Sequence, residues 1–321
     1  MTNSLDLLAI GDVCIDLYLK VEDKDATTDK HSVKPKICFY HGSKIPVKSL
    51  KTNIAGNAVN IAVGATKLGM KSAIYTEMGD DEYADRIVRE LDTYDIDTSL
   101  MHRNKDAQTG LHPVIVYGGD RTIFSHHEIR HYKVSNWPET KWIYYTSISP
   151  GFESFQKNLV KYVKDRPQVG VAFNPGTFHM QLGLAGIKNF LEITHVLFVN
   201  REEAIVLVGD HPLEMLHHKL RELGPKLTVI TLGSEGASGF DGNSFVKIDA
   251  YKINKPVIDK TGAGDAFAIG VIAALHYKKS LKEALFWGAI DSSFQIREIG
   301  STLGLVTKNQ IEEITSEHKN H

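Results

Sequence analysis

The stretch Asp259–Gly270, DKTGAGDAFAIG, places one acid, Asp265, immediately before a run of apolar residues. Glycine is costly in ordered structure, so Gly262 and Gly264 indicate that the backbone needs their conformational freedom. The residues that follow Asp265 are apolar or glycine up to Leu275, which predicts a buried helix that begins at Ala263. The acid is therefore expected in the first turn of a helix that enters the core.

The start of this helix is suited to binding an anion. Its first N–H groups have no partner inside the helix and carry the positive end of the helix dipole. Small residues allow an oxyanion to approach these groups, as a transferring phosphoryl group requires. Asp265 could then take the proton of an attacking hydroxyl group. On its own, the pattern is equally typical of an acid that only favours the dipole.

The composition limits the class of protein. The chain has 321 residues, of which 42% are hydrophobic and 24% charged, as in a globular protein with a sizeable core. The formal net charge of -2 gives no indication of nucleic acid or a membrane as partner. Cys14 and Cys38 are too few for a disulfide framework and fit a reducing compartment. Without a signal peptide or a membrane-spanning apolar run, we expect a cytoplasmic protein.

Strand and helix patterns alternate along most of the chain. This alternation predicts an α/β fold with a doubly wound, mainly parallel sheet and helices on both faces. Two excursions, at about 17–50 and 107–130, fall outside the alternation and predict a small β-sheet lid, the second with a hairpin around Gly118-Gly119-Asp120. The charged segment Glu22–His31 has no apolar period and is expected to be a loop. We expect residues 1–321 to form one domain.

Two common nucleotide-binding patterns are missing from the sequence. The residues after the first predicted strand, Gly11-Asp12-Val13-Cys14, do not form GxGxxG, and GxxxxGK[ST] does not occur. A dinucleotide-dependent dehydrogenase and a Walker-type ATPase are therefore disfavoured.

Several stretches together resemble the ribokinase-like (PfkB) carbohydrate kinase family. DKTGAGDAF resembles the DTxGAGD signature of that family, and IGDVCIDL resembles its first strand. AGNAVNIAVGATKLGMKSAIYTEMGDDEYADRI resembles the GGxxxN segment and the Gly-Asp-Asp after it. VNREEA carries the family's NxxE, and TLGSEGA resembles its nucleotide loop. The order and spacing agree from about residue 5 to about residue 310, so the resemblance implies a ribokinase-like fold.

The resemblance also implies roles in catalysis and acceptor binding. Asp265 would be the catalytic base, beside an anion hole made by the backbones of Gly262, Ala263 and Gly264. The hydroxyl groups of the acceptor would be held by Asp16, Gly56, Asn57 and Asn60.

The implied nucleotide and metal sites use other residues. Asn200 and Glu203 would arrange magnesium through water around the triphosphate of ATP. Asp259 and Thr261 would contribute to a loop that can bind a monovalent cation, potassium. The nucleotide would be bordered by Thr231, Gly233 and Gly236.

Each of these positions has an ordinary structural alternative. Asn200 and Glu203 fit a capping box at the start of a helix. Thr231–Gly236 fits a turn between strands, and Asp16 fits a surface turn. Asn57 and Asn60 fit a helix cap and a helix-face amide. Their joint occurrence in the family order favours the functional interpretation.

The sequence departs from the family pattern at three positions. Ala55 stands where the family often has the first glycine of a pair, and Asn57 stands where ribokinases typically carry lysine. Lys260 replaces a common threonine and could supply its own charge near the monovalent-cation loop. Arg121, on the predicted lid, could contact an acidic or phosphorylated substrate or could simply be solvated.

We therefore expect an ATP-dependent kinase that uses magnesium and transfers the γ-phosphoryl group to a primary hydroxyl of a small sugar. The alternatives are a nucleoside kinase of the same family and a catalytically silent protein that binds a sugar or nucleotide. The exposed edge strands of the lid predict a homodimer that pairs through the lid.

Overall fold

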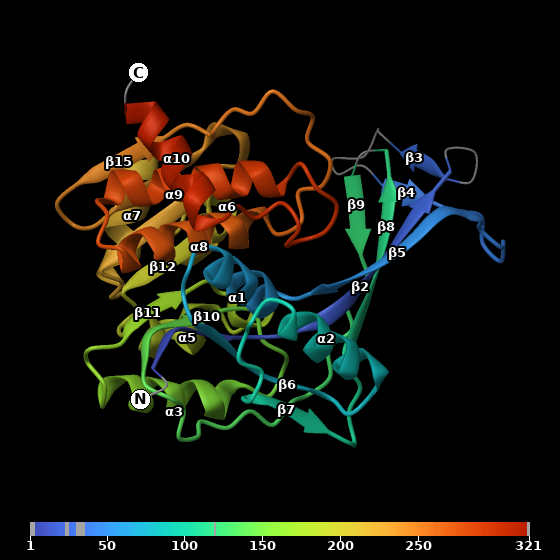
Figure 1. The fold of residues 1–321 in the computed structure, drawn as a ribbon, viewed down its shortest axis with the longest axis horizontal. Helices are drawn as coiled ribbons and strands as arrows, with labels where there is room; N and C mark the ends of the chain where they lie inside the picture. The colour runs from blue at the N-terminus through green and yellow to red at the C-terminus, as the bar shows by residue number, and fades with distance from the viewer. Residues whose placement is uncertain (1–3, 23–25, 30–35, 119, 320–321) are drawn as a thin grey trace.

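The computed structural model describes residues 4–22, 26–29, 36–118 and 120–319, and they form a nine-stranded sheet with helices on both faces (Figure 1). The strand order is β15-β14-β13-β12-β11-β10-β1-β6-β7. All pairs from β13 to β7 are parallel, whereas β14 and β15 are antiparallel additions at one edge. The strands are β1 Leu5–Ile10, β6 Ser72–Gly79, β7 Met101–Asn104, β10 Thr140–Tyr145, β11 Gly170–Phe173, β12 Val196–Asn200, β13 Leu227–Thr231, β14 Ala237–Phe240 and β15 Phe245–Ile248.

Alternation along β1 shows why both faces of the sheet are covered. Leu7 and Ala9 belong to one hydrophobic core, and Leu8 and Ile10 belong to the other. Successive side chains of a strand point to opposite faces, so an uninterrupted apolar strand must be buried on both sides. The predicted fold class is confirmed.

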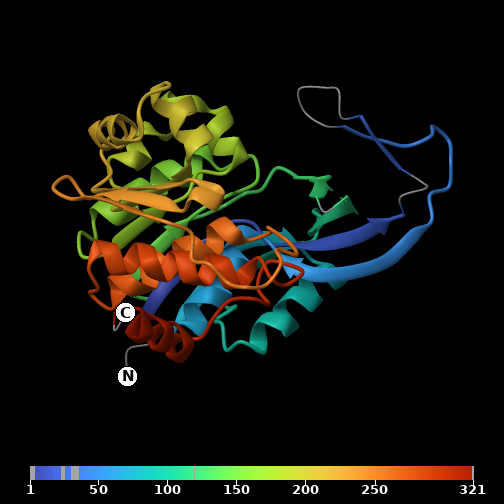
Figure 2. The same ribbon diagram turned by 90° about the horizontal axis from the view of Figure 1, so that it is seen from above.

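Two groups of helices cover the two faces. The core that contains Leu7 is closed by α1, α2, α8, α9 and α10, and the core that contains Leu8 by α3, α5, α6 and α7. Figure 2 shows the sheet between these layers. The helices are α1 Asn57–Lys67, α2 Glu82–Asp92, α3 Glu153–Lys164, α4 Thr177–Gln181, α5 Gly183–Leu191, α6 Arg201–Val208, α7 Leu213–Glu222, α8 Ala263–His276, α9 Leu281–Gln295 and α10 Lys308–Lys319, with a 3-10 turn at Gly233–Glu235.

A separate four-stranded sheet, which we call the lid, projects from the body (Figures 1 and 2). Its order is β5-β2-β8-β9, where β2 is antiparallel to β5 and parallel to β8. The hairpin between β8 and β9 is confirmed. The bounds are β2 Cys14–Val21, β5 Val47–Ala55, β8 Gly110–Tyr117 and β9 Asp120–Ile123.

One part of the expected loop at Glu22–His31 is a strand. In the structure, β3 (Thr27–Asp29) pairs with β4 (Lys36–Cys38) as a two-stranded ribbon. β4 is largely exposed, so burial of one face imposes little apolar alternation on its sequence. The positions 23–25, 30 and 31 of this expected loop lie outside the described residues.

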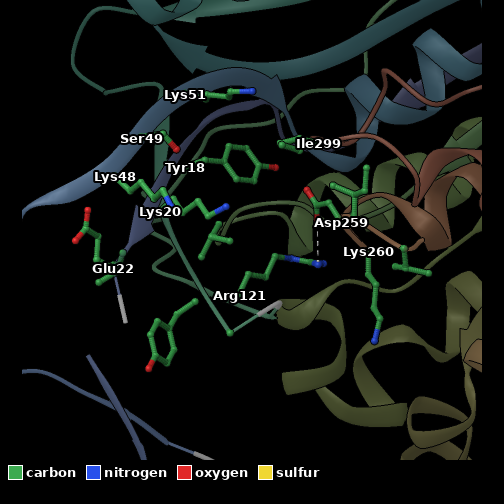
Figure 3. A pocket seen from close by; sticks show the side chains of 16 residues that line it. Tyr18, Lys20, Glu22, Lys48, Ser49, Lys51, Arg121, Asp259, Lys260 and Ile299 are labelled. Atoms are coloured by element: carbon green, nitrogen blue, oxygen red, sulfur yellow. Dashed lines mark hydrogen bonds and ion pairs between the residues drawn. The ribbon is translucent and has the colours of Figure 1, made fainter. Parts of the chain in front are cut away.

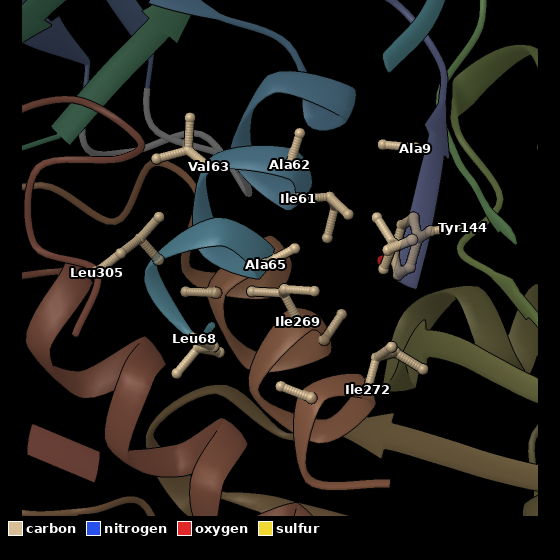
Figure 4. Packing of buried hydrophobic residues seen from close by; sticks show 14 of the residues in the cluster. Ala9, Ile61, Ala62, Val63, Ala65, Leu68, Tyr144, Ile269, Ile272 and Leu305 are labelled. Atoms are coloured by element: carbon tan, nitrogen blue, oxygen red, sulfur yellow. The ribbon is translucent and has the colours of Figure 1, made fainter. Parts of the chain in front are cut away.

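Helices α8 and α9 approach each other closely, and this approach requires glycine. A Cβ atom at Gly270 of α8 would lie 2.9 Å from the Cα atom of Gly288 in α9. In the same core, a Cβ atom at Gly64 of α1 would lie 2.6 Å from the side chain of Ile269. Figure 4 shows Ile269 beside α1. Helix α8 is thereby packed tightly between α1 and α9.

We predict that Gly270→Ala lowers the free energy of unfolding by about 1–3 kcal/mol, because the added methyl group must displace backbone atoms of α9. Urea denaturation measures this difference. Gly264→Ala is the matched control in the same helix, because a Cβ atom there meets no atom within 4 Å. Equal stability of the two variants would contradict the packing argument.

Candidate active site

A buried carboxylate occupies the first turn of α8. Asp265 is 5% exposed, and both of its oxygens accept hydrogen bonds from amide groups of α1. The Nδ2 atom of Asn57 lies 2.9 Å from Oδ1 and 3.1 Å from Oδ2, and Nδ2 of Asn60 lies 2.7 Å from Oδ2. Residues three apart share a helix face, so one face of α1 presents both donors.

These surroundings tune the acidity of Asp265. Burial raises the pKa of Asp265 to about 6, and the hydrogen bonds from Asn60 and Asn57 act in the opposite direction. Desolvation disfavours the charged form, whereas donors to the carboxylate favour it. The result is a carboxylate that is ionised at neutral pH and more basic than an exposed one, as a proton acceptor requires.

The backbone in front of Asp265 leaves room for a ligand. Gly262 caps α8 in the left-handed region with φ 75°, and a Cβ atom there would lie 2.7 Å from the carbonyl oxygen of Ser301. Gly264 faces open space. Among the described residues, no acceptor binds the N–H of Gly264. This N–H group, at the positive end of the helix, can therefore bind an anion.

Glycine also brings α1 to the end of β1. Gly56 precedes α1 with φ 108°, and a Cβ atom there would overlap the carbonyl oxygen of Asp12 and lie 2.8 Å from the Cα atom of Val13. Gly56 was expected to help hold the acceptor, and in this structure it permits close backbone approach. It places Asn57 beside the carboxyl end of β1, where ligands of open α/β sheets bind.

Asp16 supplies a second buried carboxylate, on β2 of the lid. Its Oδ2 accepts a hydrogen bond of 3.3 Å from the hydroxyl of Tyr18, and its Oδ1 lies 3.7 Å from Nδ1 of His112. Burial raises the pKa of Asp16 to about 6, and the negative charge of Asp259 adds to this rise. The charge effect shows that Asp16 lies near the loop that leads into α8. Sequence analysis missed both residues: Tyr18 lies two residues from Asp16 on the same strand, where alternation places the two side chains on one face, and His112 lies opposite Asp16 only through the pairing of β2 with β8.

Asp259 is held by the loop around it and by the lid. Its Oδ1 accepts from the backbone N–H and hydroxyl of Thr261 at 2.9 and 2.6 Å, and its Oδ2 accepts from the N–H of Gly300 at 3.0 Å. The guanidinium of Arg121 lies 3.2 Å from Oδ1. Arg121 therefore binds across the crevice in this structure, a contact that its sequence context beside a turn could not specify.

Asn200 and Glu203 form a capping box at the start of α6. The N–H of Glu203 donates to Oδ1 of Asn200 at 2.8 Å, and the N–H of Asn200 donates to Oε2 of Glu203 at 2.9 Å. Asn200 also lies opposite Thr231 in the sheet. The predicted metal residues and the predicted nucleotide loop therefore share the carboxyl edge of β12 and β13.

The nucleotide loop itself is compact. After Thr231, a 3-10 turn spans Gly233–Glu235, and the N–H of Leu232 donates to the carbonyl of Gly236. Gly236 has φ 92°, and a Cβ atom there would overlap the carbonyl oxygen of Ile248. The glycines thus permit a tight turn, which agrees with both the turn and the nucleotide-loop interpretations.

A cavity of about 730 Å³ lies between the lid and the loop that precedes α8 (Figure 3). From the lid it is lined by Tyr18, Lys20 and Lys51 among others, and from the body by the segment 257–260. Thr231, Gly233 and Gly236 are not among its described lining residues. The cavity is therefore bordered by Asp259 and by Tyr18, whose hydroxyl donates to Asp16, and not by the predicted nucleotide loop.

The comparisons with known proteins agree with this fold. Residues 4–308 match the model of the pfkB family carbohydrate kinases. The chain is 24% identical over 311 residues to 2-dehydro-3-deoxygluconokinase of Bacillus subtilis, which covers 89% of this chain and 94% of that protein. The nucleoside kinase structure of Methanocaldococcus jannaschii has a TM-score of 0.77 and 21% identity, over 98% of this chain and 99% of its own. The Arabidopsis thaliana ribokinase structure, complexed with ribose and ATP, has a TM-score of 0.78 and 20% identity, over 97% and 98%.

The chain belongs to the pfkB family of carbohydrate kinases, since the family model spans nearly its whole length. This confirms the resemblance on which the sequence analysis depended, and with it the expected class of enzyme, an ATP-dependent carbohydrate kinase. In the described part of the chain, none of the helices has the length and apolar character needed to cross a membrane.

We predict that Asn60→Leu raises the pKa of Asp265 from about 6 to about 7, because the variant removes a donor to the carboxylate without opening a large cavity. The carbon-13 resonance of the carboxyl group, followed against pH, measures this value. Asp265→Asn identifies the resonance by removing it. An unchanged pKa in Asn60→Leu would show that the hydrogen bond does not tune the acid.

Proposed function

We propose that this kinase transfers the γ-phosphoryl group of ATP to a primary hydroxyl group of a sugar, with Asp265 as the base. The observation that supports this most directly is that two features lie together at the start of α8. Burial raises the pKa of the Asp265 carboxylate to about 6, and the helix start is open at Gly264. Phosphoryl transfer needs a base and charge stabilisation at adjacent positions, and this arrangement offers both.

The reaction follows from the contacts of the resident side chains. The acceptor hydroxyl loses its proton to Asp265 as its oxygen attacks the γ-phosphorus atom, and ADP leaves with the electron pair of the broken bond. The backbone N–H groups at Gly262–Gly264 stabilise the charge on the transferring group. Asp16 accepts hydrogen bonds from other hydroxyl groups of the acceptor.

For Asn57 and Asn60, the contacts support a role in addition to the expected binding of acceptor hydroxyl groups. Because their Nδ2 atoms donate to Asp265, we propose that they position the base. The Oδ1 atom of Asn60 is buried and has no hydrogen-bond partner among the described residues. A buried acceptor of this kind is costly unless it is paired, so a hydroxyl group of the substrate is its natural donor.

We propose that magnesium binds at the carboxyl edge of β12. Asn200 and Glu203 supply hard oxygen atoms, and the capping box engages only one carboxylate oxygen of Glu203. Mg²⁺ prefers such ligands and keeps several waters, so these residues fit an ion bound through water. When bound with ATP, magnesium would neutralise charge on the phosphate groups.

Binding of potassium, the candidate monovalent cation, is a minor part of the proposal. Of the candidate monovalent-cation residues Asp259 and Thr261, Asp259 is already paired with the guanidinium of Arg121. Lys260 extends away from the lid in Figure 3. Arg121 thus supplies the positive charge beside Asp259 that Lys260 was expected to supply.

A nucleoside is the alternative acceptor. The Methanocaldococcus jannaschii neighbour is a nucleoside kinase and matches this fold over nearly its full length. A panel of neutral sugars and nucleosides, followed by ADP release, separates the two acceptor classes. Binding of sugar or nucleotide without ADP release would instead indicate a catalytically silent binding protein.

We predict that Asp265→Asn lowers kcat by about 10²–10⁴-fold, because the amide cannot accept the proton. In the unmodified enzyme, kcat/KM should rise with pH through about 6 and then level off, because the base must be ionised. Asp92→Asn, an exposed acid on α2, is the control and should retain full activity.

Asp16 has the same raised pKa of about 6, caused mainly by burial, so its contribution to the pH profile must be separated. The inflection should persist in the residual activity of Asp16→Asn. A profile that becomes flat in Asp16→Asn would assign the inflection to acceptor binding and would remove the support for Asp265 as base.

We propose a cytoplasmic homodimer that forms through the lid. Both edge regions of the lid carry exposed apolar side chains: Val47 and Leu50 on β5, Ile123 on β9 and Phe124 after it. Unpaired edge strands with such residues favour association. The two cysteines, Cys14 and Cys38, are unpaired, as in a reducing compartment.

Light scattering at micromolar protein should therefore give twice the mass of the 35.7 kDa chain. Leu50→Asp should shift the mass toward the monomer, because it buries a charge at the proposed interface. Val206→Asp, at an exposed apolar residue on α6, is the matched control and should leave the mass unchanged. A monomeric mass for the unmodified protein would exclude the proposed dimer.

A further inference from the structure

One face of the lid carries an ordered series of side chains that begins at Asp16. Along β2, alternate residues point to the same face, so Asp16, Tyr18 and Lys20 share it. Residues directly opposite each other in neighbouring strands also point to the same side. The register of the lid strands therefore shows which other side chains lie on the face of Asp16.

This register places two lysines on that face. Lys51 of β5 lies opposite Tyr18. On β2, Asp16 lies two residues before Tyr18 and Lys20 lies two residues after it. In the outermost row, Lys20 lies opposite Val116 of β8, which in turn lies opposite Arg121 of β9. The face thus changes from a carboxylate at Asp16 to cations at Lys51, Lys20 and Arg121.

The cavity beside this face is more positive than the protein as a whole. Five cationic and two acidic side chains line it, whereas the complete chain has a formal net charge of -2. Arg121 is paired with Asp259. Within the described residues, neither Lys20 nor Lys51 has a carboxylate at ion-pair distance. The lining residues with charge are Lys20, Lys48, Lys51, Arg121, Lys260, Glu22 and Asp259.

The spacing of these charges fits a small hydroxylated molecule. At about 3.3 Å per residue, the row of Tyr18 and Lys51 lies about 7 Å from Asp16 along β2, and the row of Lys20 lies about 13 Å away. A lysine side chain spans part of this distance. A sugar whose hydroxyl groups reach Asp16 therefore places its opposite end near the two amines.

Figure 3 shows the amine of Lys20 and the hydroxyl of Tyr18 pointing into the same space as the guanidinium of Arg121. The cavity is lined by Tyr18, whose hydroxyl donates to the buried Asp16, and by Lys20 and Lys51 farther along the lid. This order of charges orients a ligand, because an anionic group is repelled by Asp16 and attracted by the two amines. The hydroxyl end of such a ligand then lies toward Asp16.

We infer that the acceptor is an anionic sugar derivative, in which a carboxylate or phosphate group lies against Lys20 and Lys51 while a hydroxyl group faces Asp265. This inference rests on the proposed function, because it names the acceptor class of that same site. It replaces the uncharged sugar as the preferred acceptor.

The test compares acceptors that differ only in charge. Each neutral pentose or hexose is assayed beside its terminal phosphate ester and its aldonic acid, with ADP release as the readout and ATP and magnesium fixed. One anionic member should have a kcat/KM at least about tenfold above that of its neutral parent, and this advantage should shrink as salt is raised. Comparison of the phosphate esters with the aldonic acids distinguishes a phosphate acceptor from a carboxylate acceptor.

Charge removal in the lid provides the second arm. The double variant Lys20→Gln, Lys51→Gln should raise KM for the anionic acceptor by about 10–100-fold, with kcat and the KM for ATP little changed. Lys157→Gln is the matched control, an exposed lysine on α3, which lies away from the lid (Figure 1). It should leave every constant unchanged. A double variant with unaltered KM for the acceptor would overturn the inference.

Calorimetric binding of the same compounds separates this inference from the proposed function. ADP release with neutral sugars in preference to all of their anionic derivatives overturns the anionic acceptor and leaves the kinase intact. Binding of an anionic sugar that is lost in the double variant, without any ADP release, overturns the proposed catalysis and supports only the binding of the anionic group at Lys20 and Lys51. Absence of binding by every anionic compound overturns the inference whatever the activity.

Discussion

The carboxylate of Asp265 is buried in the first turn of α8, where amide groups of Asn57 and Asn60 hold it. Burial of an unpaired charge is expensive, so the position requires compensating donors. The dipole of α8 contributes on one side and the two amides of α1 on the other. The rest of the structure serves to bring these two helix starts together.

The packing of small residues makes this approach possible. Gly56 lets the chain pass against Asp12 and Val13, which sets the first turn of α1 at the end of β1. Gly64 of α1 and Gly270 of α8 allow neighbouring side chains and backbone to approach within contact distance. Shape complementarity of this kind leaves few alternative arrangements, because cores are close-packed. The geometry of the carboxylate therefore depends on residues more than one helical turn away from it.

The lid adds a second set of constraints to the same space. It contributes Asp16, and its register sets the order of charges that extends from Asp16 to Lys20. The ion pair between Arg121 and Asp259 connects the lid to the loop before α8. This contact couples the position of the lid to the segment that shapes the start of the helix. In the proposed function, the lid contributes to acceptor choice and the start of α8 to catalysis.

Much of the body was predictable from local sequence. The apolar strands, the helices between them and the motif at Gly262–Asp265 are encoded over short stretches, because strand and helix periodicities are local properties. The same holds for the capping box at Asn200 and Glu203. The family resemblance extended the prediction of the site to residues far apart in the chain.

The tertiary structure determined the contacts between distant residues, which local sequence patterns do not specify. The sequence at Asn57 and Asn60 predicts a helix start but not that both amides donate to Asp265, about two hundred residues away. The pairing of β2 with β8 is parallel, and alternation along a strand carries no information about the direction of its partner. Lys20 shares a face with Asp16 through alternation along β2, whereas Lys51 and Arg121 share that face only because of the strand register. Sequence determined which groups are available and which segments are buried, whereas long-range packing determined which of these groups meet, because contacts between distant residues depend on how the elements assemble.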